Sequence, residues 1–436
     1  MTTTFSRIIR KSTLWLTTGL TLFATACGGS ETMTKQTLHS SLARQTEVSL
    51  SDPDRDRLAA MGAEVAISLY RASAEEKALE NYVMSPYSVT AAFAMLYAGA
   101  KGQTAAEIAE ALAYSELGND MHRLLNATDL ELETRGEGAK GKDGADFELV
   151  TANSRFVQSG ISGWSQEWLD TLALNYGAGA HEVDFNGNSK AAADTINEWA
   201  SQSTRGKINE VVMPQLIKSW VLALANATYF NAAWQHPFDA KQTQDEPFML
   251  TEGSEVSVPM MHVEENFGYS KGEGYQAVSL PYDDADLSFV AILPEQDLPS
   301  LRAQLSAEKL REILSGINIR KVDLFMPSFS IQTEINLKKI LMSLGVKQAF
   351  SDEADLSGIH PELPLTVSDA TQKAIIDVNE SGTEAAAVTV IGAGVTSVDP
   401  NAPVRVRFDR PFLYCIVDKP TGQVLFMGHL ADPSAE

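Results

Sequence analysis

The chain has 436 residues, of which 34 are basic and 57 acidic, so its formal net charge is −23 with histidine counted as neutral. This balance argues against a nucleic-acid-binding protein, since phosphate recognition depends on concentrated lysine and arginine. Hydrophobic residues make up 44% and charged residues 21% of the chain. That composition is typical of globular proteins and can supply a sizeable packed core.

The first residues resemble an export signal. Three basic residues lie within the first eleven positions, an apolar stretch from Leu14 to Ala24 follows, and small residues then lead to Cys27. This order is typical of a secretory signal peptide, and a cysteine after small residues resembles the cleavage box of bacterial lipoproteins. We therefore expect a signal peptide over residues 1–26 and a lipidated Cys27, which would hold the exported chain on the periplasmic or cell-surface side of a membrane. The alternatives are an ordinary cleaved signal, because Ala24 stands where the box usually has leucine, and an uncleaved anchor.

The next segment has a different composition. Residues 28–52 are rich in serine, threonine, glutamine and glycine and show no hydrophobic periodicity, which is typical of a flexible tether. Length alone allows about three domains, but the rest of the chain shows neither an internal repeat nor a second linker. We expect the lipidated cysteine and its tether over residues 27–52 and one folded domain over residues 53–436.

The folded part begins with a helix, since Leu58, Met61 and Val65 recur at helical spacing. Further helices are expected over residues 105–112, 165–174, 191–204, 307–314 and 337–344. Strands are expected over residues 147–153, 221–230, 277–280, 287–293, 322–326, 404–408 and 412–417. The mixture lacks a regular β-α-β alternation, so it favours an α+β fold with large antiparallel sheets over a doubly wound nucleotide-binding fold.

The sequence carries no common hydrolase signature such as H-E-x-x-H or G-x-S-x-G. The nearest phosphate-loop match, residues 136–143, has an aspartate where a hydroxyl is required. The acidic residues 283–286 lack the glycine and glutamate of a calcium loop and favour a hairpin turn. Cys27 and Cys415 are too few for a zinc cluster or a disulfide framework, and Cys415 lies in an apolar strand typical of a buried thiol. We expect no enzyme, no metal and no cofactor.

Residues 379–400 form the most unusual stretch of the chain, because they combine small and β-branched residues with glycines. Read with the period of a strand, one face presents only small or β-branched side chains, namely Thr383, Ala385, Ala387, Thr389 and Ile391. Such a face can slide between two existing strands without bulky clashes. Glycines at 392 and 394 and Asp-Pro at 399–400 favour an exposed loop instead. The segment is therefore predicted to act both as a loop and as a strand.

The same stretch resembles the hinge of the serpin family, and further motifs of that family follow in order along the chain. The hinge corresponds to residues 380–387 and the C-terminal signature to residues 406–414. Other matches are Ser85-Pro86-Tyr87-Ser88, the segment 226–230 with Trp234 and Phe238, and residues 425–428. The resemblance covers about residues 55–433.

The resemblance implies a single domain of three β-sheets and eight or nine helices, with residues 382–400 displayed as a reactive-centre loop. In the serpin mechanism a protease attacks this loop and forms an acyl-enzyme. The freed loop then inserts as a central strand of the main sheet and distorts the active site of the protease it carries along.

The family motifs assign roles to particular residues. The hinge would consist of Glu380, Gly382, Thr383, Glu384, Ala385, Ala386 and Ala387. The shutter beneath the opening sheet would contain Ser85, Ser88 and Asn226, and Trp234 would lie at the breach where insertion begins. Without the family match, Ser85 would be a helix cap and Trp234 a core residue. Gln372 occupies the position of a shutter histidine found in many serpins; its amide can donate and accept hydrogen bonds, but a pH-sensitive shutter is not expected.

The usual hinge spacing, counted from Glu380, places the cleaved bond between Thr396 and Ser397. Alternative sites are the bonds that follow Ala393, Val395 and Val398. A small β-branched residue fits a shallow apolar pocket, which favours elastase-like or subtilisin-like serine proteases over trypsin-like ones. Val395 would also suit papain-like cysteine proteases, which read the preceding side chain.

Two functions are compatible with these residues. The first is a monomeric, extracytoplasmic inhibitor of a serine-type endopeptidase that acts as a suicide substrate. The second is a non-inhibitory binding module with the serpin fold. A charged, proline-containing or bulky hinge would favour the binding module, whereas Thr383 and the alanines after it favour the inhibitor.

Overall fold

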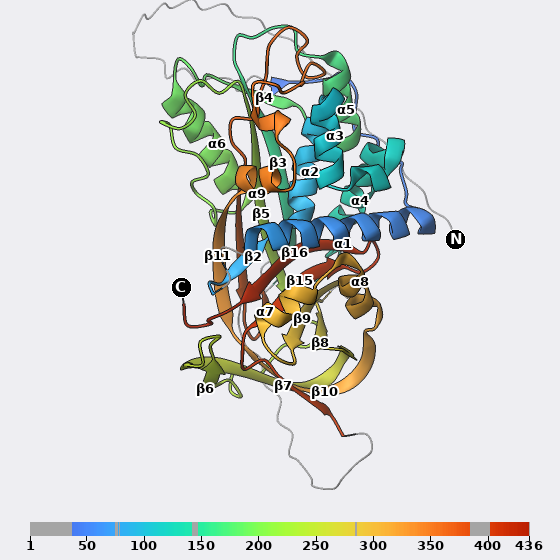
Figure 1. Cartoon of the computed structure of the whole chain (residues 1–436), viewed down its shortest axis with the longest axis vertical. Helices are drawn as coiled ribbons and strands as arrows, with labels where there is room; N and C mark the ends of the chain where they lie inside the picture. Colours follow the sequence, from blue (N-terminus) through green and yellow to red (C-terminus); the bar gives the residue numbers. More distant parts are fainter. Residues whose placement is uncertain are drawn as a thin grey trace, which may run out of the picture. The chain divides into compact units, whose positions relative to one another are not determined.

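The computed structural model describes residues 37–74, 77, 79–141, 147–283, 286–383 and 402–435. The chain from Gln36 to Glu436 forms one compact unit, whose helices and strands are shown in Figure 1. The compact unit thus begins well before the expected boundary at residue 53.

The segment before the first helix is packed against the fold. β1 (Thr37–Leu38) pairs with β4 (Ala180–Val183) at the edge of the main sheet. Arg44 donates hydrogen bonds to Asn126 over 2.8 Å and to Asp129 over 2.6 Å. The expectation of a flexible tether is therefore wrong for residues 37–52. Asn126 lies 82 residues further along the chain than Arg44, so the pairing leaves no local pattern in the sequence.

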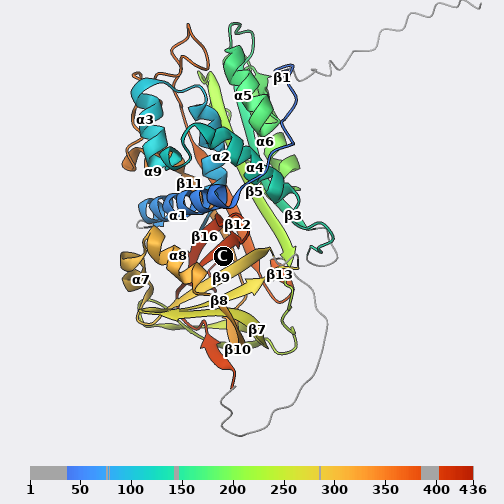
Figure 2. The ribbon, with the colours of Figure 1, turned by 90° about the vertical axis from the view of Figure 1, so that its right-hand side faces the viewer.

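The main sheet has seven strands in the order β1-β4-β3-β5-β12-β11, with β13 paired to β5 (Figure 2). Its remaining strands are β3 (Glu148–Gln158), β5 (Leu222–Ala233), β11 (Phe329–Asn336), β12 (Thr371–Val378) and β13 (Gly382–Thr383). Buried residues alternate with more exposed ones along β11 and β12, because one face of the sheet meets the core. The strands predicted over residues 147–153 and 221–230 are confirmed as β3 and β5, which begin one residue later and extend further.

A second sheet has nine strands in the order β14-β10-β7-β8-β9-β15-β16-β2, with β6 paired to β7. The strands are β2 (Tyr82–Met84), β6 (Gln244–Met249), β7 (Glu255–Gly272), β8 (Tyr275–Pro281), β9 (Leu287–Pro294), β10 (Asn318–Pro327), β14 (Val404–Arg407), β15 (Phe412–Asp418) and β16 (Gln423–Leu430). By hydrogen bonding, the described strands thus form two sheets where the resemblance implied three. The reason is that the 18-residue β7 pairs with β6 near its start and with β8 near its end, and so joins the two parts.

Nine α-helices lie within the part of the chain that the structure describes. They are α1 (Asp52–Ala74), α2 (Pro86–Tyr97), α3 (Gly102–Ala111), α4 (Met121–Glu133), α5 (Gln166–Tyr176), α6 (Ser189–Ser203), α7 (Leu298–Gln304), α8 (Ala307–Ser315) and α9 (Leu337–Ser343). None of these described helices is both long enough and apolar enough to cross a membrane.

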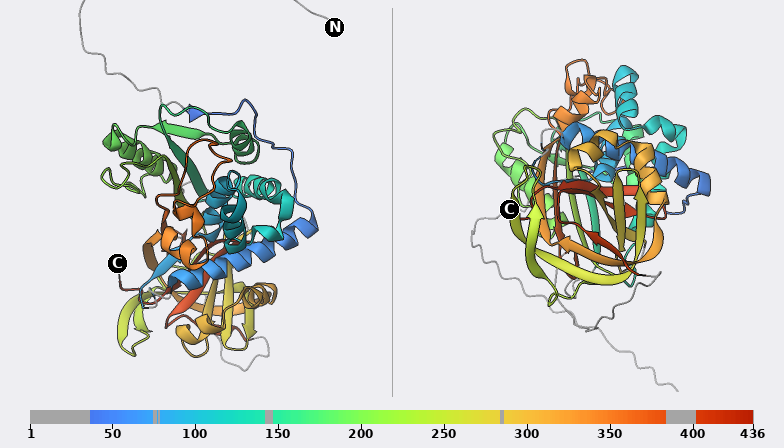
Figure 3. Two further views of the ribbon diagram at one scale, coloured as in Figure 1. Left: turned by 45° about the horizontal axis from the view of Figure 1, so that its top comes forward. Right: turned by 60° about the horizontal axis from the view of Figure 1, so that its bottom comes forward.

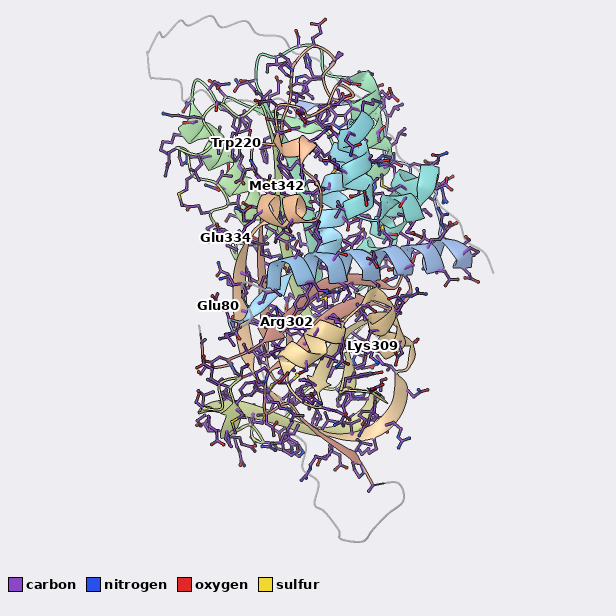
Figure 4. The ribbon with its side chains drawn as sticks, viewed as in Figure 1. Glu80, Trp220, Arg302, Lys309, Glu334 and Met342 are labelled. Carbon is purple, nitrogen blue, oxygen red and sulfur yellow. The ribbon has the colours of Figure 1, made fainter. Side chains whose placement is uncertain are left out.

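The helices cover both faces of the main sheet. α2 packs against β3, β5 and β16, where the two sheets meet (Figure 3). Val157 of β3 belongs to the same core as α2, whereas its neighbour Phe156 packs with the side chains of α6. Successive strand residues point to opposite faces, so α2 and α6 lie on opposite sides of the sheet. Trp220 packs beside α6 on that second face (Figure 4).

Candidate functional site

The centre of the main sheet is only partly closed. β5 and β12 are parallel neighbours, but their register covers only residues 226–228 of β5 and 372–374 of β12. Among the described strands, the rest of β12 from residue 375 to 378 pairs with β11 alone. A third strand running antiparallel between two parallel strands can pair its backbone with both of them.

The hinge already occupies this position at one end of the sheet. In β13, Gly382 pairs with Ala233 and Thr383 with Ala232, antiparallel to β5. The Asn379 N–H donates to the Gly382 carbonyl over 3.0 Å, so the chain turns back directly after β12. A Cβ atom at Gly382 would lie 2.2 Å from the Ala232 carbonyl oxygen, and this close approach therefore requires glycine.

Trp234 and Tyr282 hold the hinge turn in place. The backbone N–H of Trp234 donates to the Ser381 carbonyl over 2.9 Å, and its indole Nε1 donates to the Asn379 carbonyl over 2.8 Å. The rings of Trp234 and Tyr282 are stacked with centroids 4.7 Å apart. The Tyr282 hydroxyl shares a 2.9 Å hydrogen bond with Thr383 Oγ1. Trp234 is 3% and Thr383 1% exposed, so both residues belong to one buried cluster.

Glu380 is tied to the segment that follows Trp234. Its carbonyl accepts a 2.7 Å hydrogen bond from the Phe238 N–H, and its carboxylate accepts one of 2.7 Å from the Thr243 hydroxyl. The structure thus places Glu380, Gly382 and Thr383 together at the sheet. The other expected residues, Glu384, Ala385, Ala386, Ala387, Thr396, Ser397 and Cys27, lie outside the described part of the chain.

A second cluster connects β5 and β12 to α2. Gln372 Oε1 accepts a hydrogen bond from the Ser85 N–H over 2.9 Å, while its Nε2 donates to the Ser85 carbonyl over 3.0 Å and to Asn226 Oδ1 over 3.2 Å. Asn226 Nδ2 in turn donates to the Ser88 hydroxyl. The structure therefore brings together the four residues expected at the shutter. Ser85 is also the N-cap of α2, since its hydroxyl accepts from the Ser88 N–H. This confirms the helix cap, whereas the shutter role of this serine stays a prediction.

Sequence reasoning missed three residues of these clusters. The Thr228 hydroxyl donates to the Ser88 hydroxyl over 2.9 Å, and Asn153 Oδ1 accepts from Asn226 Nδ2 over 2.7 Å. Thr228 lies two residues after Asn226 in the same motif, so strand periodicity could have found it. Asn153 and Tyr282 come from distant segments, and only the strand pairing brings them to the site.

Two buried groups that could carry chemistry are held neutral. Burial raises the pKa of the Cys415 thiol to about 12, so it stays protonated and unreactive near neutral pH. Burial also lowers the pKa of His429 to about 4. Within the described residues, no three histidine, cysteine, aspartate or glutamate side chains are grouped so that they could hold a metal ion.

Comparison with known proteins identifies the family. The model of the serpin (serine protease inhibitor) family matches residues 60–433. An uncharacterized serpin-like protein of Thermococcus kodakarensis is 36% identical over 355 residues, which cover 81% of each chain. The leukocyte elastase inhibitor of Bos taurus is 33% identical over 389 residues, covering 87% of this chain and all of that protein. The crystal structure of the thermophilic serpin tengpin in its native state aligns with a TM-score of 0.76 and 25% identity, over 91% of this chain and 97% of that one.

The chain therefore belongs to the serpin family and has the serpin fold. Members of this family are mostly protease inhibitors rather than enzymes, and they typically bind target proteases. The hinge strand β13 pairs with β5, and the cluster at Gln372 connects β5 to β12.

Proposed function

We propose that the protein is a suicide inhibitor of a serine-type endopeptidase, in which cleavage of the loop releases a strand that traps the acyl-enzyme. The observation that carries this proposal is the placement of β13, whose residues Gly382 and Thr383 are already paired antiparallel with β5. The segment that follows them in the sequence presents one face of small and β-branched side chains. Insertion would extend the existing pairing of β13 with β5, so no new strand pair has to be nucleated.

Insertion also requires the two central strands to separate. The bond between Gln372 on β12 and Asn226 on β5 must break, whereas Asn226 can keep its bond to Ser88 on α2. In this proposal the cluster therefore acts as a shutter that closes the sheet before cleavage. Trp234 and Tyr282 form the breach, because they hold the first inserted residue, Thr383, in place.

The proposed cleaved bond is Thr396–Ser397, and the proposed targets are elastase-like or subtilisin-like serine proteases. Threonine before the bond suits a shallow apolar pocket. The similarity to a leukocyte elastase inhibitor over its whole length supports this target class. A papain-like cysteine protease is the alternative target.

The decisive experiment mixes the purified protein with an elastase-like protease and looks for a complex that survives boiling in SDS. The expected result is a covalent band together with a released fragment that mass spectrometry shows to begin at Ser397. The same protease with its active-site serine blocked is the matched control and should give no such band. Clean cleavage without a complex would rule out inhibition of that protease.

We further propose that the protein is exported and anchored through a lipid on Cys27. The support is the order of basic, apolar and small residues before this cysteine. Cys27→Ala should release the protein from the membrane fraction, as measured by ultracentrifugation and immunoblotting of fractionated cells. Cys415→Ala is the control, since that thiol is buried in β15. Membrane association that survives Cys27→Ala would contradict the lipid anchor.

A further inference from the structure

A cavity of about 80 Å³ lies on the α2 side of the main sheet. Asn153, which accepts a hydrogen bond from Asn226 in the cluster at Gln372, is one of its lining residues. Its walls come from α2 (Tyr87, Met95), α4 (Asp129), β3 (Arg155) and the end of α5 (Tyr176). The elements that enclose it can be followed in Figures 1 and 2. A cavity of this size holds a few water-sized groups, so it can take a molecule of only a few non-hydrogen atoms.

Arg155 is a buried cation without a counter-ion. The residue is 3% exposed, its Nε donates to the Gly179 carbonyl over 3.2 Å, and its Nη1 contacts the sulfur of Met95. Among the described residues it forms no ion pair with a carboxylate. Burial lowers the pKa of Arg155 only to about 10, so the guanidinium remains charged near neutral pH. A buried charge without an opposite charge is strongly unfavourable.

The carboxylate in the cavity does not compensate this charge. Asp129 is paired with Arg44 across 2.6 Å, and Arg44 itself lies in the segment before α1. The negative charge of Asp129 is therefore balanced by Arg44 and does not compensate the charge of Arg155. The single charge of a monocarboxylate can pair with Arg155, whereas the second charge of a dicarboxylate would be left unpaired beside Asp129.

The other side chains that line the cavity suit a small ligand with an anionic group at one end and an apolar group at the other. Tyr87 and Tyr176 contribute phenol rings to the lining, and the Tyr176 hydroxyl shares a 2.7 Å hydrogen bond with His122 Nδ1. Burial raises the pKa of both phenols, which keeps them protonated. Ala91, Leu125 and Ala178 add apolar surface, and Asn153 adds an amide. A guanidinium binds a planar carboxylate through two parallel hydrogen bonds.

We propose that this cavity is a binding site for a short-chain monocarboxylate, of the size of acetate or propionate, whose carboxylate pairs with Arg155 and whose alkyl group contacts Ala91 and Leu125. Bound there, the ligand would bridge β3 and α2. Because it binds only the folded protein, it would raise the unfolding temperature in a saturable way.

The test uses the full chain with sodium acetate, propionate, succinate and chloride as probes at constant ionic strength. Isothermal titration calorimetry and thermal unfolding are measured for the protein, for Arg155→Met and for Arg320→Met, whose arginine is exposed on β10. We expect saturable binding of acetate and propionate, no comparable effect of succinate or chloride, and affinity at least about tenfold weaker in Arg155→Met. Without ligand, Arg155→Met should be as stable as the parent or more stable, because the unpaired charge is gone.

Ala91→Leu provides a second variant that keeps Arg155 and fills the cavity from α2, and it decides the question if Arg155→Met does not fold. It should abolish binding while Arg320→Met retains it. The proposal is overturned if the parent protein shows no saturable response to either monocarboxylate. It is equally overturned if Arg155→Met and Ala91→Leu respond as the parent does.

Discussion

At the scale of single residues, Gln372 connects β12 to β5 and to the start of α2 through an amide that cannot ionise. It is fully buried and bonds to the Ser85 N–H, the Ser85 carbonyl and Asn226. Gln372→Ala would leave these groups without partners, so we expect the free energy of unfolding to fall by about 2 to 3 kcal/mol. Urea denaturation followed by intrinsic fluorescence measures the change.

The neighbouring residue offers a matched control for this substitution. Lys373 forms an ion pair with Glu334 of the edge strand β11 across 3.1 Å, and Glu334 is largely exposed (Figure 4). Exposed pairs contribute little, so Lys373→Ala should lower the free energy of unfolding by less than about 1 kcal/mol. If Gln372→Ala and Lys373→Ala lower the free energy of unfolding equally, the buried hydrogen bonds of Gln372 contribute no more to stability than an exposed ion pair.

His429 makes stability depend on pH. Its Nδ1 accepts a 2.9 Å hydrogen bond from the Tyr70 hydroxyl, and its Nε2 donates to the Lys77 carbonyl over 3.1 Å. Burial lowers its pKa to about 4 from the ordinary 6.5. The unfolded chain therefore takes up a proton near pH 6.5 while the folded protein does not, and stability present above pH 6.5 is lost as the pH falls towards 4.

The contribution of His429 over that range is on the order of 3 kcal/mol. His429→Gln should therefore show a flatter dependence of the unfolding free energy on pH between 6.5 and 4, measured by denaturant titration at several pH values. His39→Gln is the control, because His39 is exposed and its loss should leave the slope unchanged. An unchanged slope in His429→Gln would contradict the buried, neutral state of this histidine.

At the scale of elements, the proposed insertion of the loop depends on the two-residue strand β13, which is paired with β5. Thr383 is 1% exposed and bonded to Tyr282, so Thr383→Arg would place a charge in a closed apolar and aromatic cluster at a cost of several kcal/mol. We expect this variant to be cleaved by the target protease without forming an SDS-stable complex. Complex yield is read from gels at increasing ratios of inhibitor to protease.

Thr383→Ser is the matched control for the hinge, since it keeps the hydroxyl that bonds to Tyr282. It should form the complex with nearly the parent's yield. A parent-like yield in Thr383→Arg as well would mean that trapping does not require this residue to enter the sheet.

Elements with a local signature could be predicted from the sequence, and those defined by distant partners could not. The apolar runs at residues 287–293 and 412–417 correspond to β9 and β15, whose residues are all buried. No helix was expected over α4, because its buried Asn126 and its Asp129 interrupt the apolar pattern and are satisfied by Arg44. The contacts of Arg44 with Asn126 and Asp129 also explain why residues 37–52 pack against the fold and do not form a flexible tether.

The residues of the candidate site likewise divide into those that a sequence motif predicts and those that only distant strand partners bring to the site. The motifs that resemble serpins lead to Ser85, Ser88, Asn226, Trp234, Gln372 and the described hinge residues, which the structure brings into two clusters. Asn153 could not be found in this way, because it reaches Asn226 only through the register of β3 on β5. Arg155 lies among buried residues of β3, so its position in the sequence pattern gives no sign of a site. It stands out only because it has no ion-pair partner among the described residues.

At the scale of the whole molecule, the partly closed sheet implies that the intact protein is less stable than its cleaved form. β5 and β12 share only three register positions, and a strand inserted after Thr383 would pair with backbone groups on both of them. If each new hydrogen bond contributes about 1 kcal/mol, roughly ten of them would stabilise the cleaved molecule by on the order of 10 kcal/mol. Cleavage within residues 384–401 should therefore raise the unfolding temperature by tens of degrees.

Differential scanning calorimetry of the protein before and after limited proteolysis measures this shift, with the cleavage site confirmed by mass spectrometry. The hinge variants separate insertion from loop removal. Cleaved Thr383→Ser should gain stability as the parent does, whereas cleaved Thr383→Arg should unfold near the temperature of its intact form, because the charge blocks the first step of insertion. A cleaved parent protein that unfolds at the temperature of the intact one would show that no strand enters the sheet, and the loop would then be a substrate and not a trap.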